Sequence, residues 1–152
     1  MVVYAFDVDE TLEVSKGPVK LVDLVTLREH GHIVGLCGNW AMVTLHCPDW
    51  HHICSFVGPC GIEKDDFLRQ LRQYIPGDDY VMVGNILGMS GASDDRGAAE
   101  RAGWRFIQES EFAKGCAEEA VGAMEEGGDQ KQCEPKATLG GFRFGWASFW
   151  WG

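Results

Sequence analysis

Short runs of apolar residues, bounded by polar or glycine-containing turns, recur along the chain up to about residue 107. A run that is apolar throughout is typical of a strand buried on both faces of a parallel sheet. The first run, VVYAF, ends directly at Asp7. The runs predict strands over residues 2–6, 32–37, 53–57, 80–83 and 104–107. Strands of this kind predict one buried parallel sheet.

Between these runs, apolar positions recur with the spacing of helices. Helices are predicted over residues 19–30, 63–74 and 94–102. Gly31 supplies a C-terminal stop for the first helix, and Asp94 with its neighbours suits the N-cap and first turn of the third. Residues 40–52 fit neither pattern, because AMVTLH would begin a helix that Pro48 ends early. Residues 113–135 predict one more helix followed by a polar linker.

Alternating strands and helices predict an α/β fold, and we expect a three-layer α/β/α sandwich of Rossmann type with a central parallel sheet and right-handed crossovers. In such folds ligands bind beyond the carboxyl ends of the strands. A chain of 152 residues can bury one core but is short for two ordinary domains. We expect one domain over residues 1–135. Residues 136–152, where aromatic and small residues alternate, are interpreted as a tail that forms an interface or a lid.

Charge and composition narrow the function. A net charge of -10 argues against a mainly electrostatic grip on nucleic acid or on an anionic membrane. No apolar stretch approaches the roughly 18 to 20 residues of a membrane span, and the first residues lack the basic region of a signal peptide. The expected compartment is the cytoplasm. The 6 cysteines are therefore expected to be free thiols.

The candidate chemistry begins at the end of the first strand, in the segment FDVDETL. Asp7 and Asp9 are separated by one residue, and a turn at the strand end allows both carboxyl groups to reach one phosphate. A carboxylate can attack phosphorus and form an aspartyl-phosphate, while a second carboxyl group protonates the leaving oxygen and later activates water. We assign Asp7 as the nucleophile and Asp9 as the general acid and base.

This segment resembles the first motif of the haloacid dehalogenase (HAD) superfamily, a strand followed by Asp-x-Asp-x-Thr and an apolar residue. The match covers Asp7, Asp9, Thr11 and Leu12. The resemblance implies a phosphoric monoester hydrolase that needs Mg²⁺ and passes through an aspartyl-phosphate. It also implies that Thr11 belongs to the phosphate-binding side of the site.

The second and third motifs of the family are matched unequally. The second motif ends a strand with Ser or Thr, and Gly38 stands at that place, so the hydroxyl is missing. We expect the backbone N–H groups of Gly38 and Asn39, or the Asn39 amide, to take over part of the phosphate contact. The third motif is a lysine at the start of a helix, and Lys64 occupies that position. Its ammonium would offset charge on the nucleophile and on the phosphoryl oxygens.

The fourth motif normally follows the fourth strand as Gly-Asp with a second Asp a few residues later. Here Gly84 is followed by Asn85, and after a longer loop the chain reaches Asp94 and Asp95. Mg²⁺ prefers oxygen ligands and keeps several waters. The resemblance implies a Mg²⁺ site made of Asp7, the Asp9 backbone carbonyl and either Asp94 or Asp95.

The gaps between the motifs are too short to hold the cap domain that many family members carry. The resemblance therefore implies an open site that accepts macromolecular phosphoesters or is closed by a second subunit of a homo-oligomer. Two other hypotheses stay open. One is a noncatalytic binding or scaffold domain with the same fold. The other is a zinc site in the segment from His46 to Cys60, where histidine and cysteine are dense but lack the paired spacing of common zinc modules.

Overall fold

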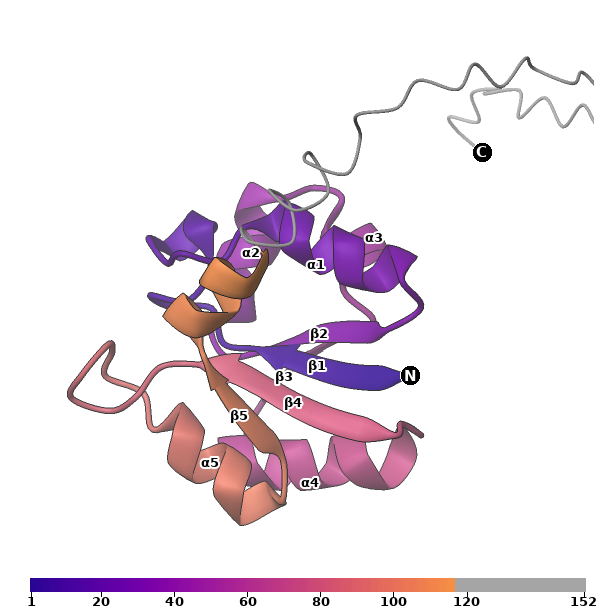
Figure 1. The fold of residues 1–152 in the computed structure, drawn as a ribbon, viewed down its shortest axis with the longest axis vertical. Coiled ribbons are helices and arrows are strands. Elements are labelled where there is room, and N and C mark those ends of the chain that lie inside the picture. Colours follow the sequence, from indigo (N-terminus) through magenta and orange to yellow (C-terminus); the bar gives the residue numbers. More distant parts are fainter. Residues whose placement is uncertain (117–152) are drawn as a thin grey trace, which may run out of the picture.

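The computed structural model of the protein describes residues 1–116, which form an α/β unit around a five-stranded sheet (Figure 1). The strands are β1 (Val2–Phe6), β2 (Ile33–Cys37), β3 (Phe56–Gly58), β4 (Asp79–Gly84) and β5 (Arg105–Gln108). They lie in the order β3-β2-β1-β4-β5, and every neighbouring pair is parallel. The α/β class and the parallel sheet predicted from the sequence are confirmed.

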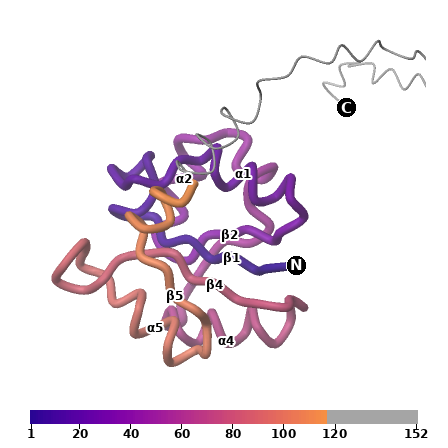
Figure 2. Tube along the Cα trace, viewed as in Figure 1, coloured from indigo at the N-terminus to yellow at the C-terminus, as the bar shows by residue number. Residues whose placement is uncertain are grey.

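The helices lie on both sides of this sheet. They are the 3-10 turn η1 (Glu13–Ser15) and the α-helices α1 (Leu21–Glu29), α2 (Trp40–His46), α3 (Trp50–Ile53), α4 (Lys64–Tyr74) and α5 (Asp95–Ala102), and residues 109–116 are also helical. Figure 1 and the tube in Figure 2 show α1, α2 and α3 on one side of the strands and α4 and α5 on the other. In the described residues, no helix is long and apolar enough to cross a membrane.

The continuous apolar run of β1 is explained by two separate cores. Phe6 packs into an apolar cluster that also contains Leu24 of α1 and Val43 of α2. Val3 and Ala5 pack into a second cluster with residues of α4 and α5. Successive side chains of a strand point to opposite faces, so a strand with a core on each face needs apolar residues at every position.

The prediction of a strand over residues 53–57 was wrong for residues 53–55. Ile53 ends α3, and its buried side chain belongs to the cluster beneath α1 to α3. The N–H of Cys54 donates to the Trp50 carbonyl and closes that helix. β3 begins at Phe56, which pairs with Gly35 of β2. A short apolar run does not distinguish a strand from the end of a buried helix.

Other boundaries shift by a few residues. The first predicted helix begins two residues late because Val19 forms a bridge with Leu12 before the chain turns into α1. The segment without a clear pattern forms α2 and α3, and Pro48 lies between them. The helix expected from residue 113 is already helical at residue 109. The remainder of that helix and the tail at 136–152 lie outside the described residues.

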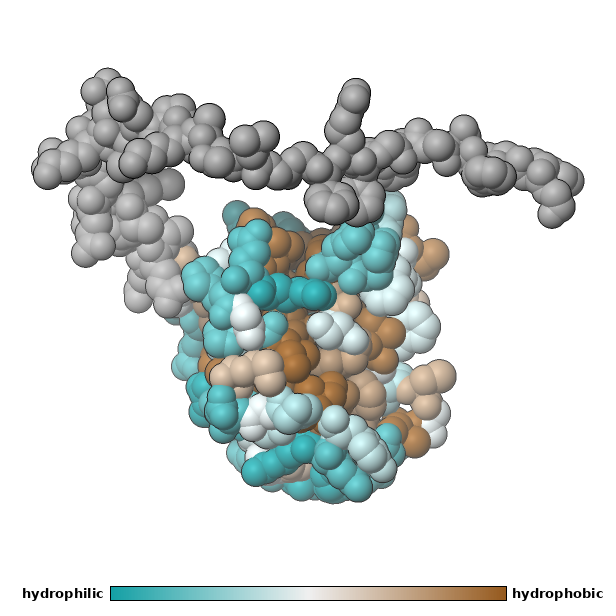
Figure 3. Space-filling model, turned by 90° about the vertical axis from the view of Figure 1, so that its right-hand side faces the viewer, coloured by the Kyte–Doolittle hydropathy of each residue, from teal (hydrophilic) through white to brown (hydrophobic). Residues whose placement is uncertain are grey.

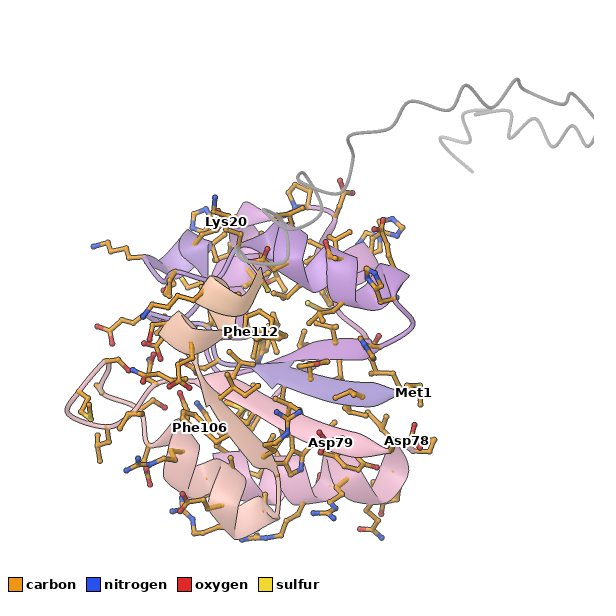
Figure 4. All side chains as sticks on the ribbon, viewed as in Figure 1. Met1, Lys20, Asp78, Asp79, Phe106 and Phe112 are labelled. Carbon is orange, nitrogen blue, oxygen red and sulfur yellow. The ribbon has the colours of Figure 1, made fainter. Side chains whose placement is uncertain are left out.

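The two ends of the sheet differ in character. At the amino ends of the strands, the Met1 amino group pairs with Asp78, and both are labelled in Figure 4. Figure 3 shows this end from outside, with apolar residues in its middle and toward its right side and hydrophilic residues mainly at the left and the bottom. At the carboxyl ends, Asp7, Gly38 and Asn85 directly follow β1, β2 and β4. Because these strands are neighbours in the sheet, the three residues are brought to one place.

Candidate active site

Asp7 lies at the centre of the carboxyl edge of the sheet. Its N–H donates to the Val83 carbonyl at 2.8 Å, which extends the pairing of β1 with β4 by one residue. Its carboxyl group is buried, with only 4% of the side chain exposed. The first aspartate predicted from the sequence is therefore held rigidly at the sheet edge rather than in a solvated turn.

Lys64, the first residue of α4, joins Asp7 to a second buried carboxylate. Its Nζ lies 2.8 Å from Asp7 Oδ1 and 3.1 Å from Ser93 Oγ, and it also donates to Asp95 Oδ1. Lys64 is 19% exposed, whereas Asp95 is fully buried. One ammonium thus lies between two carboxylates, and the structure brings together three of the residues predicted from the sequence.

Burial shapes the protonation of this cluster. It raises the pKa of Asp7 to about 6, because it disfavours the charged carboxylate more than the neighbouring ammonium of Lys64 favours it. The charge of Asp95 adds to the rise. Burial also disfavours the charged form of Lys64, but the two carboxylates outweigh it and raise the pKa of Lys64 above its usual value. At neutral pH Asp7 is ionised and Lys64 is protonated.

Both oxygens of Asp95 are taken up by protein donors. Oδ1 accepts from Lys64 and from Ser93 Oγ at 2.7 Å, and Oδ2 accepts from the Asn85 N–H at 2.8 Å. A Cβ on Gly84 would lie 2.5 Å from Asp95 Oδ2, so glycine at the end of β4 makes room for this carboxylate. Asp95 fixes Lys64 and the loop after β4.

Asp94, the other predicted metal ligand, has a different role in this structure. It is the N-cap of α5, and its Oδ1 accepts from the Gly97 N–H at 3.1 Å. Its Oδ2 lies 3.3 Å from Arg101 in an exposed ion pair. Capping and ion pairing of this kind stabilise the start of a helix. The structure therefore gathers Asp95, but not Asp94, with Asp7 and Lys64.

Thr11 and Asn85 form the side of the site opposite Lys64. The fully buried Thr11 hydroxyl lies 3.3 Å from Asp7 Oδ2 and 3.2 Å from Asn85 Oδ1. Asn85 Nδ2 donates to the Asp9 carbonyl at 2.9 Å. Asn85 thus connects the backbone of Asp9 to the Thr11 hydroxyl, which in turn contacts the Asp7 carboxylate.

Asp9 lies at the exposed mouth of the same site. Its Oδ1 accepts from Ser15 Oγ at 2.9 Å and from Asn39 Nδ2 at 3.2 Å. The structure therefore brings Asn39 to the site through Asp9. Ser15 was missed by the sequence analysis, because only the η1 turn carries it back over the end of β1.

Gly38 approaches the Asp7 carboxylate so closely that a side chain has no room. A Cβ there would lie 2.3 Å from Asp7 Oδ1 and 3.2 Å from the Val8 nitrogen. Its N–H donates to the Gly58 carbonyl at 2.8 Å. In this structure the amide hydrogen is used between β2 and β3, so a phosphate contact through the Gly38 N–H stays a prediction.

Oxygen-bearing groups of the types that bind a small hard cation lie together at this site. Asp7 Oδ2, the Asp9 carbonyl and the Asn85 amide are connected through the Thr11 and Asn85 hydrogen bonds just described. A carboxylate, a carbonyl and an amide oxygen are the ligand types that Mg²⁺ takes alongside water. Asp7 is the only one of these three groups that carries a negative charge, so the set is weaker than one with two carboxylates.

The candidate zinc ligands are spread over several elements. Cys54 is buried at the end of α3, whereas His51 and His52 on α3 are exposed. Burial raises the pKa of Cys54 to about 12, so its thiol is protonated in this structure. Within residues 1–116, no group of three or more His, Cys, Asp and Glu side chains is placed to hold a metal ion.

A cavity of about 630 Å³ opens beside Asp9 and Asn85. Its walls come from the η1 turn, from α2 and from the loop after β4, and include Val14, Met42 and Ala92. Figure 2 shows that the loop after β4 extends outward before it returns to α5. A cavity of this volume is in the range of small-molecule sites.

Comparisons of the chain with protein family models, with curated proteins and with solved structures give no match.

Proposed function

We propose that this protein is a magnesium-dependent phosphatase that hydrolyses a phosphate monoester through an aspartyl-phosphate on Asp7. We further propose that it has the three-layer α/β/α sandwich of the HAD superfamily without a cap domain. The observation that carries the proposal is the contact of 2.8 Å between the buried Asp7 carboxylate and Lys64, with Asp9 at the mouth of a cavity beside it.

The environment of Asp7 suits a nucleophile. A carboxylate attacks phosphorus only when ionised, and a pKa of about 6 leaves Asp7 ionised at neutral pH. Burial removes water that would otherwise solvate its oxygens, so the carboxylate is held by a few fixed donors. Lys64 offsets charge on Asp7 and would do the same for phosphoryl oxygens that approach it.

Asp9 is placed to donate and to accept a proton during the reaction. It is exposed at the cavity, two residues from the nucleophile, where the organic oxygen of a bound ester would lie. In the first step Asp7 forms a bond to phosphorus, the ester P–O bond breaks, and the departing oxygen takes the proton of Asp9. In the second step Asp9 accepts a proton from water, the water oxygen attacks phosphorus, and inorganic phosphate leaves Asp7.

Mg²⁺ would be held by Asp7, the Asp9 carbonyl and Asn85, and when bound it would neutralise part of the charge on the phosphoryl group. Side chains of the protein would stabilise the remaining negative charge on the phosphoryl group. Lys64 contacts Asp7 from the other side and is itself fixed by Asp95 and Ser93. In this proposal Asp95, whose two oxygens both accept hydrogen bonds from protein donors, positions Lys64.

The residues that line the cavity indicate which kind of substrate would fit there. Val14, Met42 and Ala92 make part of its lining apolar, while Asp9, Asn85, Glu10 and Lys16 supply polar and charged groups. We propose an ester whose phosphate reaches Asp7 and whose organic group rests against the apolar part of this lining. In the absence of a cap, that organic group can belong to a larger molecule, and a neighbouring subunit can cover the opening.

The test is an assay of a generic aryl phosphate with and without Mg²⁺, using the wild type, Asp7→Asn and Asp49→Asn. Asp49 is an exposed aspartate whose side chain does not cap the helix that follows it, so it is a matched control. We expect magnesium-dependent turnover in the wild type and in the control, and its loss in Asp7→Asn. Acid quenching during turnover should leave phosphate covalently attached to the peptide that contains Asp7.

Two results would overturn the proposal. Turnover that survives Asp7→Asn would show that the nucleophile is another group. A wild type that hydrolyses no member of a phosphate-ester panel with Mg²⁺ would favour the noncatalytic binding domain.

A further inference from the structure

Asp9 is held by hydrogen bonds from two segments that lie far apart in the sequence. Ser15 Oγ donates to Asp9 Oδ1 at 2.9 Å, and Asn39 Nδ2 donates to the same oxygen at 3.2 Å. We propose that Ser15 and Asn39 are positioning residues that fix Oδ1 of Asp9, so that Oδ2 exchanges the proton with the ester oxygen. This inference rests on the proposed phosphatase activity.

The two oxygens of Asp9 are in different situations. Oδ1 has two donors, whereas Oδ2 accepts no hydrogen bond from any residue between 1 and 116. A proton added to Asp9 is repelled from Oδ1, because both neighbouring groups already point hydrogen atoms at it. The proton that is transferred therefore belongs on Oδ2. The same two bonds restrict rotation of the carboxyl group, which an exposed aspartate would otherwise undergo freely.

Asn39 contacts Asp9 and does not make the helix-capping hydrogen bond that is usual at its position. It precedes α2 as the N-cap residue, and Asn at that position commonly accepts a hydrogen bond from the first turn of the helix. No such bond is present in α2. The amide instead points its NH₂ group at Asp9. A cap residue that leaves its helix uncapped and contacts a carboxylate across the site indicates a functional demand.

Ser15 is held in place by the tight turn that contains η1. Its N–H donates to the Leu12 carbonyl at 2.9 Å, and its carbonyl accepts from the Glu10 N–H at 3.1 Å. A Cβ on Gly17 would lie 2.0 Å from the carbonyl carbon of Thr11, so glycine is needed for this turn to close. The Ser15 hydroxyl is therefore preorganised against Asp9, as catalytic geometry requires.

Two kinds of ester, an aryl phosphate and an alkyl phosphate, distinguish a residue that positions Asp9 from a residue that binds the phosphate. An aryl phosphate with an acidic phenol releases a stable anion and needs little protonation, whereas an alkyl phosphate needs its leaving oxygen to be protonated as the P–O bond breaks. The value of kcat/KM reports the steps up to departure of that oxygen. A defect in proton donation by Asp9 must therefore fall on the alkyl ester.

The experiment measures kcat/KM for p-nitrophenyl phosphate and for an alkyl phosphate with Ser15→Ala, Asn39→Ala and the double variant. General acids contribute roughly 10² to 10⁴ in rate, so misplacing one should cost about tenfold or more on the alkyl ester. The aryl ester should change less than about threefold by the same reasoning. Ser15→Thr keeps the hydroxyl and should restore most of the loss. Ser55→Ala, at an exposed serine distant in sequence from these segments, is the matched control.

Each remaining outcome decides against the proposal. An equal loss on both esters would show that Ser15 and Asn39 bind the phosphate or support the fold, and thermal unfolding distinguishes these two. No loss on either ester would show that Asp9 needs no positioning. A wild type without turnover on both esters would overturn the phosphatase itself, which is a different result from an active enzyme whose variants show no difference between esters.

Discussion

Lys64 Nζ lies 2.8 Å from Asp7 Oδ1 and also contacts the carboxylate of Asp95, so one ammonium compensates only one of two buried negative charges. The cluster as a whole carries an excess negative charge at neutral pH. Such an arrangement costs stability, because a buried charge is tolerated only when it is paired and hydrogen-bonded. A cost of this kind at a site is expected where it serves a reaction.

Replacing Asp7 by Asn should stabilise the protein above about pH 6. The pKa of Asp7 is raised from 3.8 to about 6. Its ionisation in the folded state is thus unfavourable by about 3 kcal/mol. Below the lower of these two pKa values, the Asp7 carboxyl is protonated in both the folded and the unfolded chain, so its ionisation costs no stability. As pH rises from about 4 to about 6, the wild type loses stability relative to Asp7→Asn. Urea unfolding at a series of pH values measures this difference.

The control for this prediction is Asp49→Asn, since Asp49 is exposed and neutralising it removes no buried charge. A difference between wild type and Asp7→Asn that stays constant with pH, or one that favours the wild type as pH rises, would contradict the prediction.

Replacing Lys64 by Met should destabilise the protein strongly. Asp7 and Asp95 would then face each other without the cation that contacts both. Removing one partner of a buried ion pair typically costs about 3 to 5 kcal/mol. The free energy of unfolding at neutral pH should fall by about that amount. Lys114→Met removes an exposed lysine and should have little effect. A loss below about 1 kcal/mol for Lys64→Met would mean that water solvates both carboxylates.

The meeting of Asp7 and Lys64 follows from features that a sequence displays. A wholly apolar run predicts a parallel strand with a core on each face, and the carboxyl ends of neighbouring parallel strands share one edge. Asp7 directly follows such a run, and Lys64 begins the helix after β3. Those two positions alone place the pair at one edge of the sheet.

Other parts of the site depend on how turns close, which residue spacing does not reveal. Ser15 reaches Asp9 only because the η1 turn folds back on Leu12, and Ser93 reaches Lys64 from the loop before α5. The use of the Gly38 N–H by Gly58 depends on where β3 begins. That boundary was predicted incorrectly, because Ile53 belongs to a buried helix end.

Adding a side chain at Gly38 should impair turnover. A Cβ there would lie 2.3 Å from Asp7 Oδ1, so the carboxylate must move away from Lys64. A displacement of this size at a reacting group can cost about 10²-fold in rate, and we expect at least a tenfold loss of kcat/KM in Gly38→Ala. Gly38→Ser introduces the same Cβ and one further atom, so it should be impaired at least as much as Gly38→Ala.

Gly115→Ala is the matched control for that pair of variants, because a Cβ at Gly115 has no heavy atom within 4 Å. Equal activity of wild type and Gly38→Ala would show that Asp7 takes another rotamer during the reaction and that its contact with Lys64 is dispensable.

Replacing Asn85 by Asp should make the stability of the protein depend on Mg²⁺. Asn85 is buried, and its NH₂ group donates to the Asp9 carbonyl at 2.9 Å. An aspartate there would oppose that carbonyl with a negative oxygen and would add a third carboxylate near Asp7 and Asp95. Without metal, we expect a loss of about 2 to 3 kcal/mol from the unpaired buried charge. With Mg²⁺ bound between these oxygens, the repulsion becomes attraction, because the cation takes carboxylate and carbonyl ligands together.

The measurement is thermal unfolding of wild type and Asn85→Asp across a range of Mg²⁺ concentrations. A ligand that binds only the folded state stabilises it by RT ln(1 + [L]/Kd), so the melting temperature begins to rise once the ligand concentration exceeds Kd. The variant should start lower, and its rise should begin at a Mg²⁺ concentration at least about tenfold lower, equivalent to about 1.4 kcal/mol of binding free energy. Asp94→Asn, at a carboxylate occupied by the α5 cap, should keep the wild-type response to Mg²⁺. Parallel Mg²⁺ responses of wild type and Asn85→Asp would place the cation away from residue 85.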